Sequence, residues 1–217
     1  MLNKVLRRKQ LEQEVESMNR LPPGQSLTNK FPVLHYGPTP HTDLKTWDFR
    51  VFGLVEEEKV WNWEAFNQLP RTNIMMDLHC VTRWSKFDTK WEGVSVKTLI
   101  DEGFIKPKPE AEFVVQHCEY GYTTNTPLEL ILQDNFLLAT HYEGQPIPVE
   151  HGWPLRGLIG SFADRSEAKT AYLWKGGKWL RGLEFRATDK LGFWENAGYH
   201  NEADPWQEQR FSRGGWF

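Results

Sequence analysis

The 217-residue sequence has only two cysteines and lacks the residue patterns on which common metal and nucleotide sites depend. Its only cysteines are Cys80 and Cys118, and no C-x-x-C pair or H-x-x-x-H spacing occurs, so a four-ligand zinc site is not expected. Neither a G-x-G-x-x-G nor a P-loop pattern is present. The sequence therefore argues against structural zinc and against the common glycine-rich nucleotide loops.

The sequence also has no large excess of positive or negative charge and no long apolar run. The formal net charge is −3, which argues against nucleic acid as a partner, because binding it requires a basic excess or patch. No apolar run approaches the roughly 20 residues that span a bilayer. The basic N-terminus leads into polar residues rather than an apolar core, so we expect no secretory signal and a cytoplasmic protein. In that compartment a Cys80–Cys118 disulfide is not expected.

Tryptophan is abundant, with 11 residues in the chain. Tryptophans in such number fit either an aromatic core or the walls of a deep pocket. Composition alone leaves both interpretations open.

The N-terminal region differs in pattern from the rest of the chain. Residues 2–20 place apolar residues at roughly helical spacing in a charged background, which predicts a helix whose apolar stripe lies on the body. We expect a helical extension over residues 1–25 and a single domain over 26–217. Residues 31–40 are proline-rich but too aromatic to be disordered, so an ordered, extended strap is expected there.

The remaining pattern predicts short strands and short helices joined by loops. Strands are expected at 47–51, 74–80, 113–118, 136–139 and 179–185, and helices at 62–69, 95–102 and 128–132. Residues 160–169 show no clear period and are expected to form a surface loop. This mixture predicts an α+β fold with mixed sheets rather than regular βαβ winding.

Three motifs carry the residues best suited to chemistry. They are Asp77-Leu-His-Cys-Val-Thr-Arg-Trp-Ser85, His151-Gly-Trp-Pro-Leu-Arg156 and Lys175-Gly-Gly-Lys-Trp-Leu-Arg181. The thiolate of Cys80 suits a soft transition metal, and arginine and lysine suit a phosphate or another anion. Together they predict a bound anionic cofactor. Arg83 is the cation closest in sequence to Cys80, so we expect it to orient an anionic substrate.

The chain resembles the sulfite-oxidase-type molybdopterin-binding domain, and above all the short bacterial sulfite oxidase-like oxidoreductases, over about residues 30–210. The resemblance rests on motifs in the same order: Cys80-Val-Thr-Arg-Trp-Ser, Trp91-Glu-Gly-Val, His117-Cys-Glu-Tyr-Gly-Tyr-Thr-Thr, Glu150-His-Gly-Trp-Pro-Leu-Arg, Trp174-Lys-Gly-Gly-Lys-Trp-Leu-Arg-Gly-Leu-Glu, and the tail Gly192-Phe-Trp-Glu with Asp204-Pro-Trp. It implies an α+β fold with mixed sheets and a molybdenum-molybdopterin cofactor.

The resemblance also implies roles for particular residues. Cys80 falls where the family's cysteine ligates molybdenum. His151 and Arg156 fall in a motif that binds the pterin and its phosphate, and Lys178, with Gly176 and Gly177 beside it, matches a pterin-binding lysine. His35 and Tyr36 precede the place of the family's first pterin-contacting loop. Cys118 lies near another pterin contact, although a structural role is the simpler interpretation of this thiol.

The chain departs from the family pattern in two places. Residues 157–170 look longer than the usual connection. The sequence also contains nothing resembling the haem domain or the immunoglobulin-like domain of larger sulfite oxidases, so electrons are expected to pass to or from a separate protein. The several arginines of a sulfite pocket are not recognisable, which leaves sulfite itself open as the substrate.

We therefore predict a molybdopterin-dependent oxidoreductase that transfers oxygen to or from a small sulfite- or sulfoxide-like compound. Two alternatives stay open. A cofactor-free cysteine hydrolase would use Cys80 as nucleophile and His79 or His151 as base, which requires a Cys–His hydrogen bond. A tryptophan-rich binding module would perform no chemistry.

Overall fold

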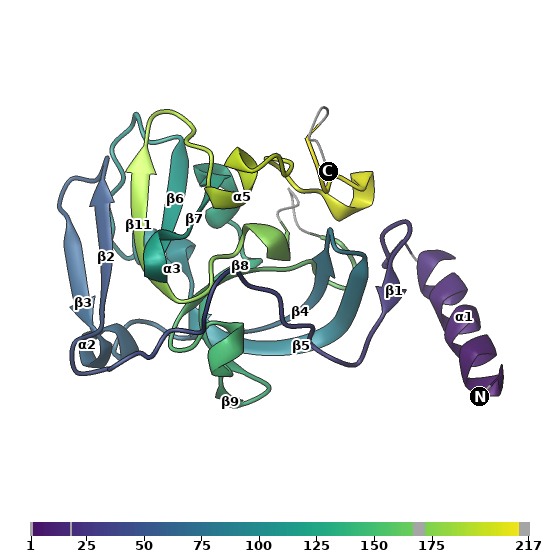
Figure 1. Cartoon of the computed structure of the whole chain (residues 1–217). Helices are drawn as coiled ribbons and strands as arrows, with labels where there is room; N and C mark the ends of the chain where they lie inside the picture. The colour runs from purple at the N-terminus through teal and green to yellow at the C-terminus, as the bar shows by residue number, and fades with distance from the viewer. Residues whose placement is uncertain (1, 18, 167–171, 213–217) are drawn as a thin grey trace.

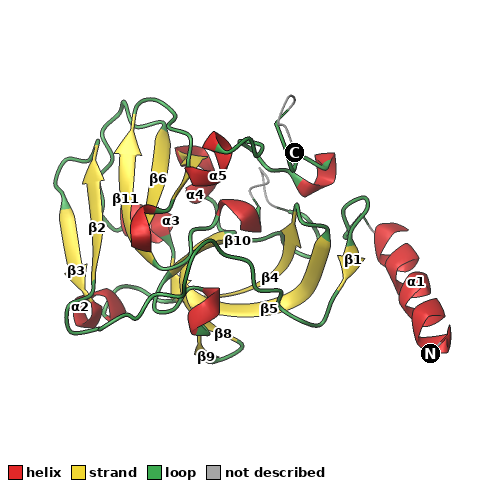
Figure 2. Cartoon of the chain, viewed as in Figure 1, coloured by secondary structure: helices red, strands yellow, loops and turns green. Residues whose placement is uncertain are grey.

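Two mixed β-sheets form the body of the protein in the computed structural model, which describes residues 2–17, 19–166 and 172–212 (Figure 1). Short helices and long connections surround them (Figure 2). The α+β class expected from the sequence is confirmed. Among the described residues, no helix is both long and apolar enough to cross a membrane.

The first sheet has five strands in the order β3-β2-β11-β6-β7. Their bounds are β2 Asp48–Gly53, β3 Lys59–Asn62, β6 Phe113–Cys118, β7 Thr123–Pro127 and β11 Leu180–Arg186. Strands β2 and β11 are parallel and the other neighbours are antiparallel. Alternate side chains of β2, including Phe49 and Val51, are fully buried, as the alternating pattern predicts.

The second sheet is built around the long strand β5, which pairs with β4 along most of its length. The bounds in this sheet are β1 Ser26–Leu27, β4 Thr72–Cys80, β5 Trp84–Val94, β8 Phe136–Tyr142, β9 Gln145–Pro146 and β10 Arg156–Ile159. Strand β4 carries a bulge at Asp77, which pairs with Ser161 instead of with β5. Residues 160 and 161 are thus buried against β4, so the expected surface loop begins only after them. Residues 167–169 of that loop lie outside the described residues.

Four of the five described α-helices are short, and two of them begin at side-chain caps. Their bounds are α1 Leu2–Ser17, α2 Trp63–Asn67, α3 Val96–Asp101, α4 Leu128–Ile131 and α5 Phe193–Asn196. The side chains of Asn62 and Ser95 accept hydrogen bonds from the backbone N–H groups of Ala65 and Thr98, which caps α2 and α3. These caps explain why the predicted and observed helix starts nearly agree.

The expected packing of α1 on the body is wrong for the side chains that can be placed. Val5, Leu6 and Leu11 are each about half exposed, and Figure 1 shows α1 at the edge of the molecule next to β1, away from the five-stranded sheet. The chain joins the body just after this helix. Arg20 donates two hydrogen bonds to the buried carboxylate of Asp77, at 2.6 and 2.8 Å, and β1 then pairs with the start of β5.

Candidate functional site

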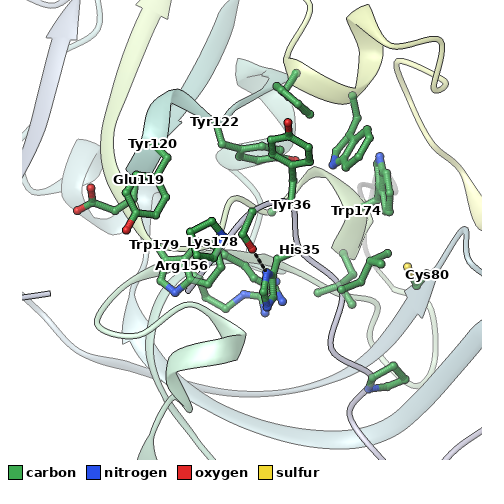
Figure 3. Close-up of a pocket in the computed structure, with 18 of the residues that line it drawn as sticks. His35, Tyr36, Cys80, Glu119, Tyr120, Tyr122, Arg156, Trp174, Lys178 and Trp179 are labelled. Carbon is green, nitrogen blue, oxygen red and sulfur yellow. Dashed lines mark hydrogen bonds between the residues drawn. The ribbon is translucent and has the colours of Figure 1, made fainter. Parts of the chain in front are cut away.

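A cavity of about 310 Å³ opens between the two sheets and collects segments that are far apart in the sequence. Its walls come from the strap at 31–38, the end of the β4–β5 hairpin, the turn at 119–122, the start of β10, the segment that precedes β11, and α5. Six of the residues predicted from the sequence line it: His35, Tyr36, Cys80, Arg156, Gly176 and Lys178. Figure 3 shows Cys80 and Trp174 on one side of the view and Arg156 and Lys178 on the other.

Cys80 is the last residue of β4 and is 4% exposed. The turn after it has three residues, because Cys80 pairs with Trp84 at the start of β5. Arg83 completes this turn in the left-handed region, with φ +71°, and its N–H donates to the Cys80 carbonyl at 2.9 Å. Burial raises the pKa of the Cys80 thiol, and the Thr82 hydroxyl, which donates to Sγ at 3.1 Å, acts in the opposite direction.

A buried polar network holds the Cys80 backbone from behind. The Gln25 side chain donates to the Cys80 carbonyl at 3.0 Å and accepts a hydrogen bond from the Ser85 hydroxyl. That hydroxyl also contacts Nδ1 of His79 at 2.8 Å. Burial is the main reason that the pKa of His79 falls to about 3. His79 therefore belongs to the support of the hairpin rather than to the cavity.

Arg156 is buried inside the protein, at 2% exposed, without a carboxylate partner among the described residues. Its guanidinium donates to the backbone carbonyls of His151, at 3.0 Å, and Gly157, at 3.2 Å. Burial lowers its pKa to about 10. A buried charge without a counter-ion is costly, which indicates that this end of the cavity is built for an anion.

Lys178 adds a second positive charge beside Arg156. Its ammonium donates to the Glu150 carbonyl at 2.8 Å. Burial, followed by repulsion from Arg156, lowers its pKa to about 7. The two side chains thus form a cationic end of the cavity. With a pKa of about 7, the ammonium of Lys178 loses its proton as the pH rises through neutrality.

The strap is held across the cavity chiefly by ring contacts. Phe31 stacks on His151 with ring centres 3.8 Å apart, and His35 meets the edge of Trp179 at 5.1 Å. Tyr36, although 62% exposed, packs on Phe193 at 4.7 Å. His35 and Tyr36 therefore lie in the cavity wall.

His151 lies behind that wall rather than in it. It is buried, its pKa falls to about 3 chiefly because of burial, and its Nδ1 has no hydrogen-bond partner among the described residues. An unpaired buried nitrogen next to Arg156 and Lys178 is consistent with a missing polar group at this place.

Gly176 and Gly177 allow two backbone segments to pack closely beneath the cavity. The Gly177 carbonyl accepts a hydrogen bond from the N–H of Gly157 at 2.8 Å, and the N–H of Gly177 donates to the side-chain oxygen of Gln116 at 2.9 Å. A Cβ added at Gly177 would lie only 2.5 Å from Sγ of Cys118, and one at Gly176 would collide with the Gly157 carbonyl. Cys118 is thus a buried thiol under Gly177, outside the cavity lining, and its pKa is raised by burial.

Sequence reasoning missed a buried ion pair that positions one wall. The ammonium of Lys175 bonds to the carboxylate of Glu195 and, at 3.0 Å, to Oδ1 of Asn125. Glu195 lies in α5, which carries the cavity-lining Phe193 and Trp194. Nothing in the local sequence marks this pair, because Lys175 and Glu195 meet only where α5 and the short helical turn at Leu173–Lys175 both pack against β7.

Arg83 does not lie where the sequence analysis expected it. Its side chain is exposed and does not line the cavity. Arg210, from the C-terminal segment, instead acts electrostatically on Cys80, and its Nε is buried without a partner among the described residues. The proposed orienting role of Arg83 therefore stays a prediction.

The donor set around Cys80 fits a metal that brings most of its ligands with it. Among the described residues no group of three His, Cys, Asp or Glu side chains could hold a metal ion. The cavity offers one thiol at one end and two cations at the other, which matches a metal-bearing cofactor with an anionic tail.

Comparison with known proteins shows which family has this sequence. The family model described as the oxidoreductase molybdopterin binding domain matches residues 36–194. The chain is 40% identical over 198 residues to "Uncharacterized oxidoreductase YuiH" of Bacillus subtilis (strain 168), which covers 91% of this chain and 94% of that protein.

More distant similarities agree. The chain is 26% identical over 181 residues to "Putative protein-methionine-sulfoxide reductase subunit YedZ1" of Azospira oryzae, covering 82% of this chain and 64% of that one. A crystal structure of the sulfane dehydrogenase SoxCD from Paracoccus pantotrophus superposes with a TM-score of 0.57 at 19% identity, over 72% of this chain and 42% of that one. This last likeness supports the fold alone.

Proposed function

Because the chain belongs to the family of oxidoreductase molybdopterin-binding domains and so takes molybdenum-molybdopterin as its cofactor, we propose that it transfers an oxygen atom to or from a small neutral oxo compound of the sulfoxide class. In this proposal Cys80 ligates the metal. Arg156 and Lys178 bind the phosphate of the cofactor, and His35 and Tyr36 contact the pterin from the strap.

The observation that carries the substrate class is the nature of the cavity wall near Cys80. Trp84, Leu173 and Trp174 line the cavity with Cys80, and the only arginine and lysine among its described lining residues are Arg156 and Lys178. If the cofactor phosphate uses those two charges, no cation of the lining is left for a sulfite dianion. Burying an unpaired anion is costly, whereas a neutral sulfoxide presents apolar groups that pack well on aromatic rings.

The remaining predicted residues have less direct roles in this proposal. His151, Gly176 and Gly177 hold the strap and the segment before β11 in place around the cofactor, and Cys118 packs beneath them. When bound, the cofactor supplies the two-electron oxo-transfer chemistry. The protein positions it, and the strap limits the access of water. A separate electron-carrier protein completes the cycle, and the relative named as a reductase subunit is consistent with that division of labour.

The hydrolase alternative requires an imidazole next to Cys80. Among the described residues, the hydrogen bond to Sγ comes from Thr82, and no histidine contributes one. Nδ1 of His79 is hydrogen-bonded to the Ser85 hydroxyl. Burial raises the pKa of the Cys80 thiol, whereas a nucleophilic cysteine needs a lowered pKa. The geometry therefore favours metal ligation over hydrolysis.

The proposal is tested with protein made in a host that synthesises the cofactor. We expect about one molybdenum per chain by elemental analysis. We also expect kcat/KM to be higher for methionine sulfoxide or dimethyl sulfoxide, with a reduced viologen as donor, than for sulfite with ferricyanide as acceptor. Preferred oxidation of sulfite would refute the substrate class, and protein that takes up no molybdenum would refute the proposal as a whole.

Two cysteine variants test the ligand assignment. Cys80→Ser should lose turnover while the fold persists, because the metal loses its only protein thiolate. Cys118→Ser is the matched control and should keep most of the activity, because this thiol lies outside the cavity lining. Equal losses in the two variants would mean that the thiols are wrongly assigned.

A further inference from the structure

The Thr82 hydroxyl is the one side-chain hydrogen-bond donor to Sγ of Cys80 among the described residues, at 3.1 Å. We propose that Thr82 is a positioning residue that aims the Cys80 sulfur at the metal and sets the electron-donating strength of the metal–sulfur bond. This inference rests on the proposed function, because it takes Cys80 as the ligand. It gives a role to Thr82, which lies in the Cys80 motif without an assigned role and is not among the residues that line the cavity.

The geometry of the hairpin explains why Thr82 can reach the sulfur. Because the turn has only three residues and Arg83 adopts the left-handed conformation, the chain folds back sharply after Cys80. The side chain of Thr82 is thereby brought over that of Cys80. Threonine is also stiff at χ1, so its hydroxyl is held in few orientations.

The Cys80 backbone is fixed by groups other than Thr82. Its carbonyl accepts hydrogen bonds from Gln25, at 3.0 Å, and from the N–H of Arg83, at 2.9 Å. The Cys80–Trp84 pairing of β4 and β5 adds to this support. Removing the Thr82 hydroxyl should therefore change the surroundings of the sulfur without moving the strand that carries it.

A hydrogen bond to a ligating sulfur has a predictable electronic consequence. It withdraws electron density from the thiolate, so the sulfur donates less to the metal and the reduced metal is relatively stabilised. Loss of the bond should lower the midpoint potential of the bound molybdenum. It should also shift the absorption that arises from charge transfer between sulfur and metal.

The experiment compares three variants of the molybdenum-loaded protein. Thr82→Val keeps the shape and removes the donor, and Thr82→Ser keeps the donor. Thr46→Val is the control, because this exposed threonine donates only to the carbonyl of Asp43, away from the cavity. Molybdenum content, melting temperature, the midpoint potential from a redox titration followed by electron paramagnetic resonance, and the visible spectrum are measured for each.

We expect Thr82→Val to show a lower potential and a shifted spectrum, while Thr82→Ser and Thr46→Val match the wild type. Loss of molybdenum from Thr82→Val but not from Thr82→Ser would support the positioning role as well. A wild-type potential and spectrum in loaded Thr82→Val would overturn the proposal, as would equal changes in the Val and Ser variants. Cys80→Ser separates the two levels: if loaded Cys80→Ser keeps the wild-type spectrum, Cys80 is not the ligand, and the proposed function and this inference fail together.

Discussion

Replacing Arg156 should separate cofactor binding from the stability of the protein. In the empty protein this guanidinium is buried without a carboxylate, and burial lowers its pKa from its usual range above 12 to about 10. At roughly 1.4 kcal/mol per pKa unit, that depression corresponds to a penalty of about 3 kcal/mol on the charged form. Arg156→Met removes this penalty.

The same substitution also removes favourable contacts. Two hydrogen bonds from the charged guanidinium to the carbonyls of His151 and Gly157 are lost, at about 1.5–3 kcal/mol each. The removed penalty offsets half or more of this loss, so the unfolding free energy of the cofactor-free variant should fall by no more than about 3 kcal/mol. Cofactor binding has no such compensation. Losing a charge-assisted hydrogen bond to phosphate costs roughly 1.5–3 kcal/mol, or about 10- to 100-fold in affinity.

The assay measures pterin content by fluorescence after oxidation, molybdenum by elemental analysis, and unfolding by urea in the cofactor-free form. Arg71→Met is the control, because Arg71 pairs with Glu92 at 2.8 Å outside the cavity lining and should affect stability without changing loading. Arg156→Lys should load poorly too, because an ammonium does not reproduce the fork of a guanidinium. If Arg156→Met unfolds several kcal/mol more easily while its cofactor content stays full, Arg156 is a structural residue and the reasoning is wrong.

Four further outcomes follow from the structure. A bound cofactor phosphate would raise the pKa of Lys178 from about 7, so the affinity of the cofactor-free protein for the cofactor should be greatest below pH 7 and should fall as the pH rises above 7. In Lys178→Met that decline should disappear. Gln25→Ala should destabilise the protein by about 1–3 kcal/mol in urea unfolding, through the buried polar groups it leaves unpaired. Arg83→Gly should keep cofactor content and turnover and melt no lower, because glycine suits the left-handed turn; full loading with lost turnover would instead support the substrate-orienting role. Lys175→Met or Glu195→Gln alone should cost about 3–5 kcal/mol in the same urea assay, and the double variant should cost clearly less than the sum.

Several elements could be predicted from the sequence because local rules govern them. Strand β6 has the bounds that its apolar run predicts, and Asn62 and Ser95 mark the starts of α2 and α3. Strand β5 was missed although it is the longest strand. Its inward-facing positions include Ser85 and Thr89, which are fully buried but polar, so a search for alternating hydrophobicity passes over it.

The sequence by itself determined the chemical groups of the site and their order along the chain. A thiol at the end of a predicted strand, with an arginine and a lysine in glycine-containing motifs, predicted an anionic cofactor, and the resemblance of these motifs to the molybdopterin-binding family implied which cofactor it is. Only the tertiary structure decided which of these groups share a cavity. It brings Cys80, Arg156 and Lys178 together between two sheets, and it leaves the side chain of Arg83 at the surface.

The physical reason is that the spacing of residues in the sequence predicts which way side chains point within one helix or strand, whereas a cavity is formed by side chains from several elements. Arg83 is three residues from Cys80, yet the left-handed turn that closes the hairpin carries its side chain outward. Gln25, 55 residues away, reaches the Cys80 carbonyl because β1 pairs with β5. Such contacts depend on strand pairing and on the packing of buried polar groups, and local sequence patterns do not encode either.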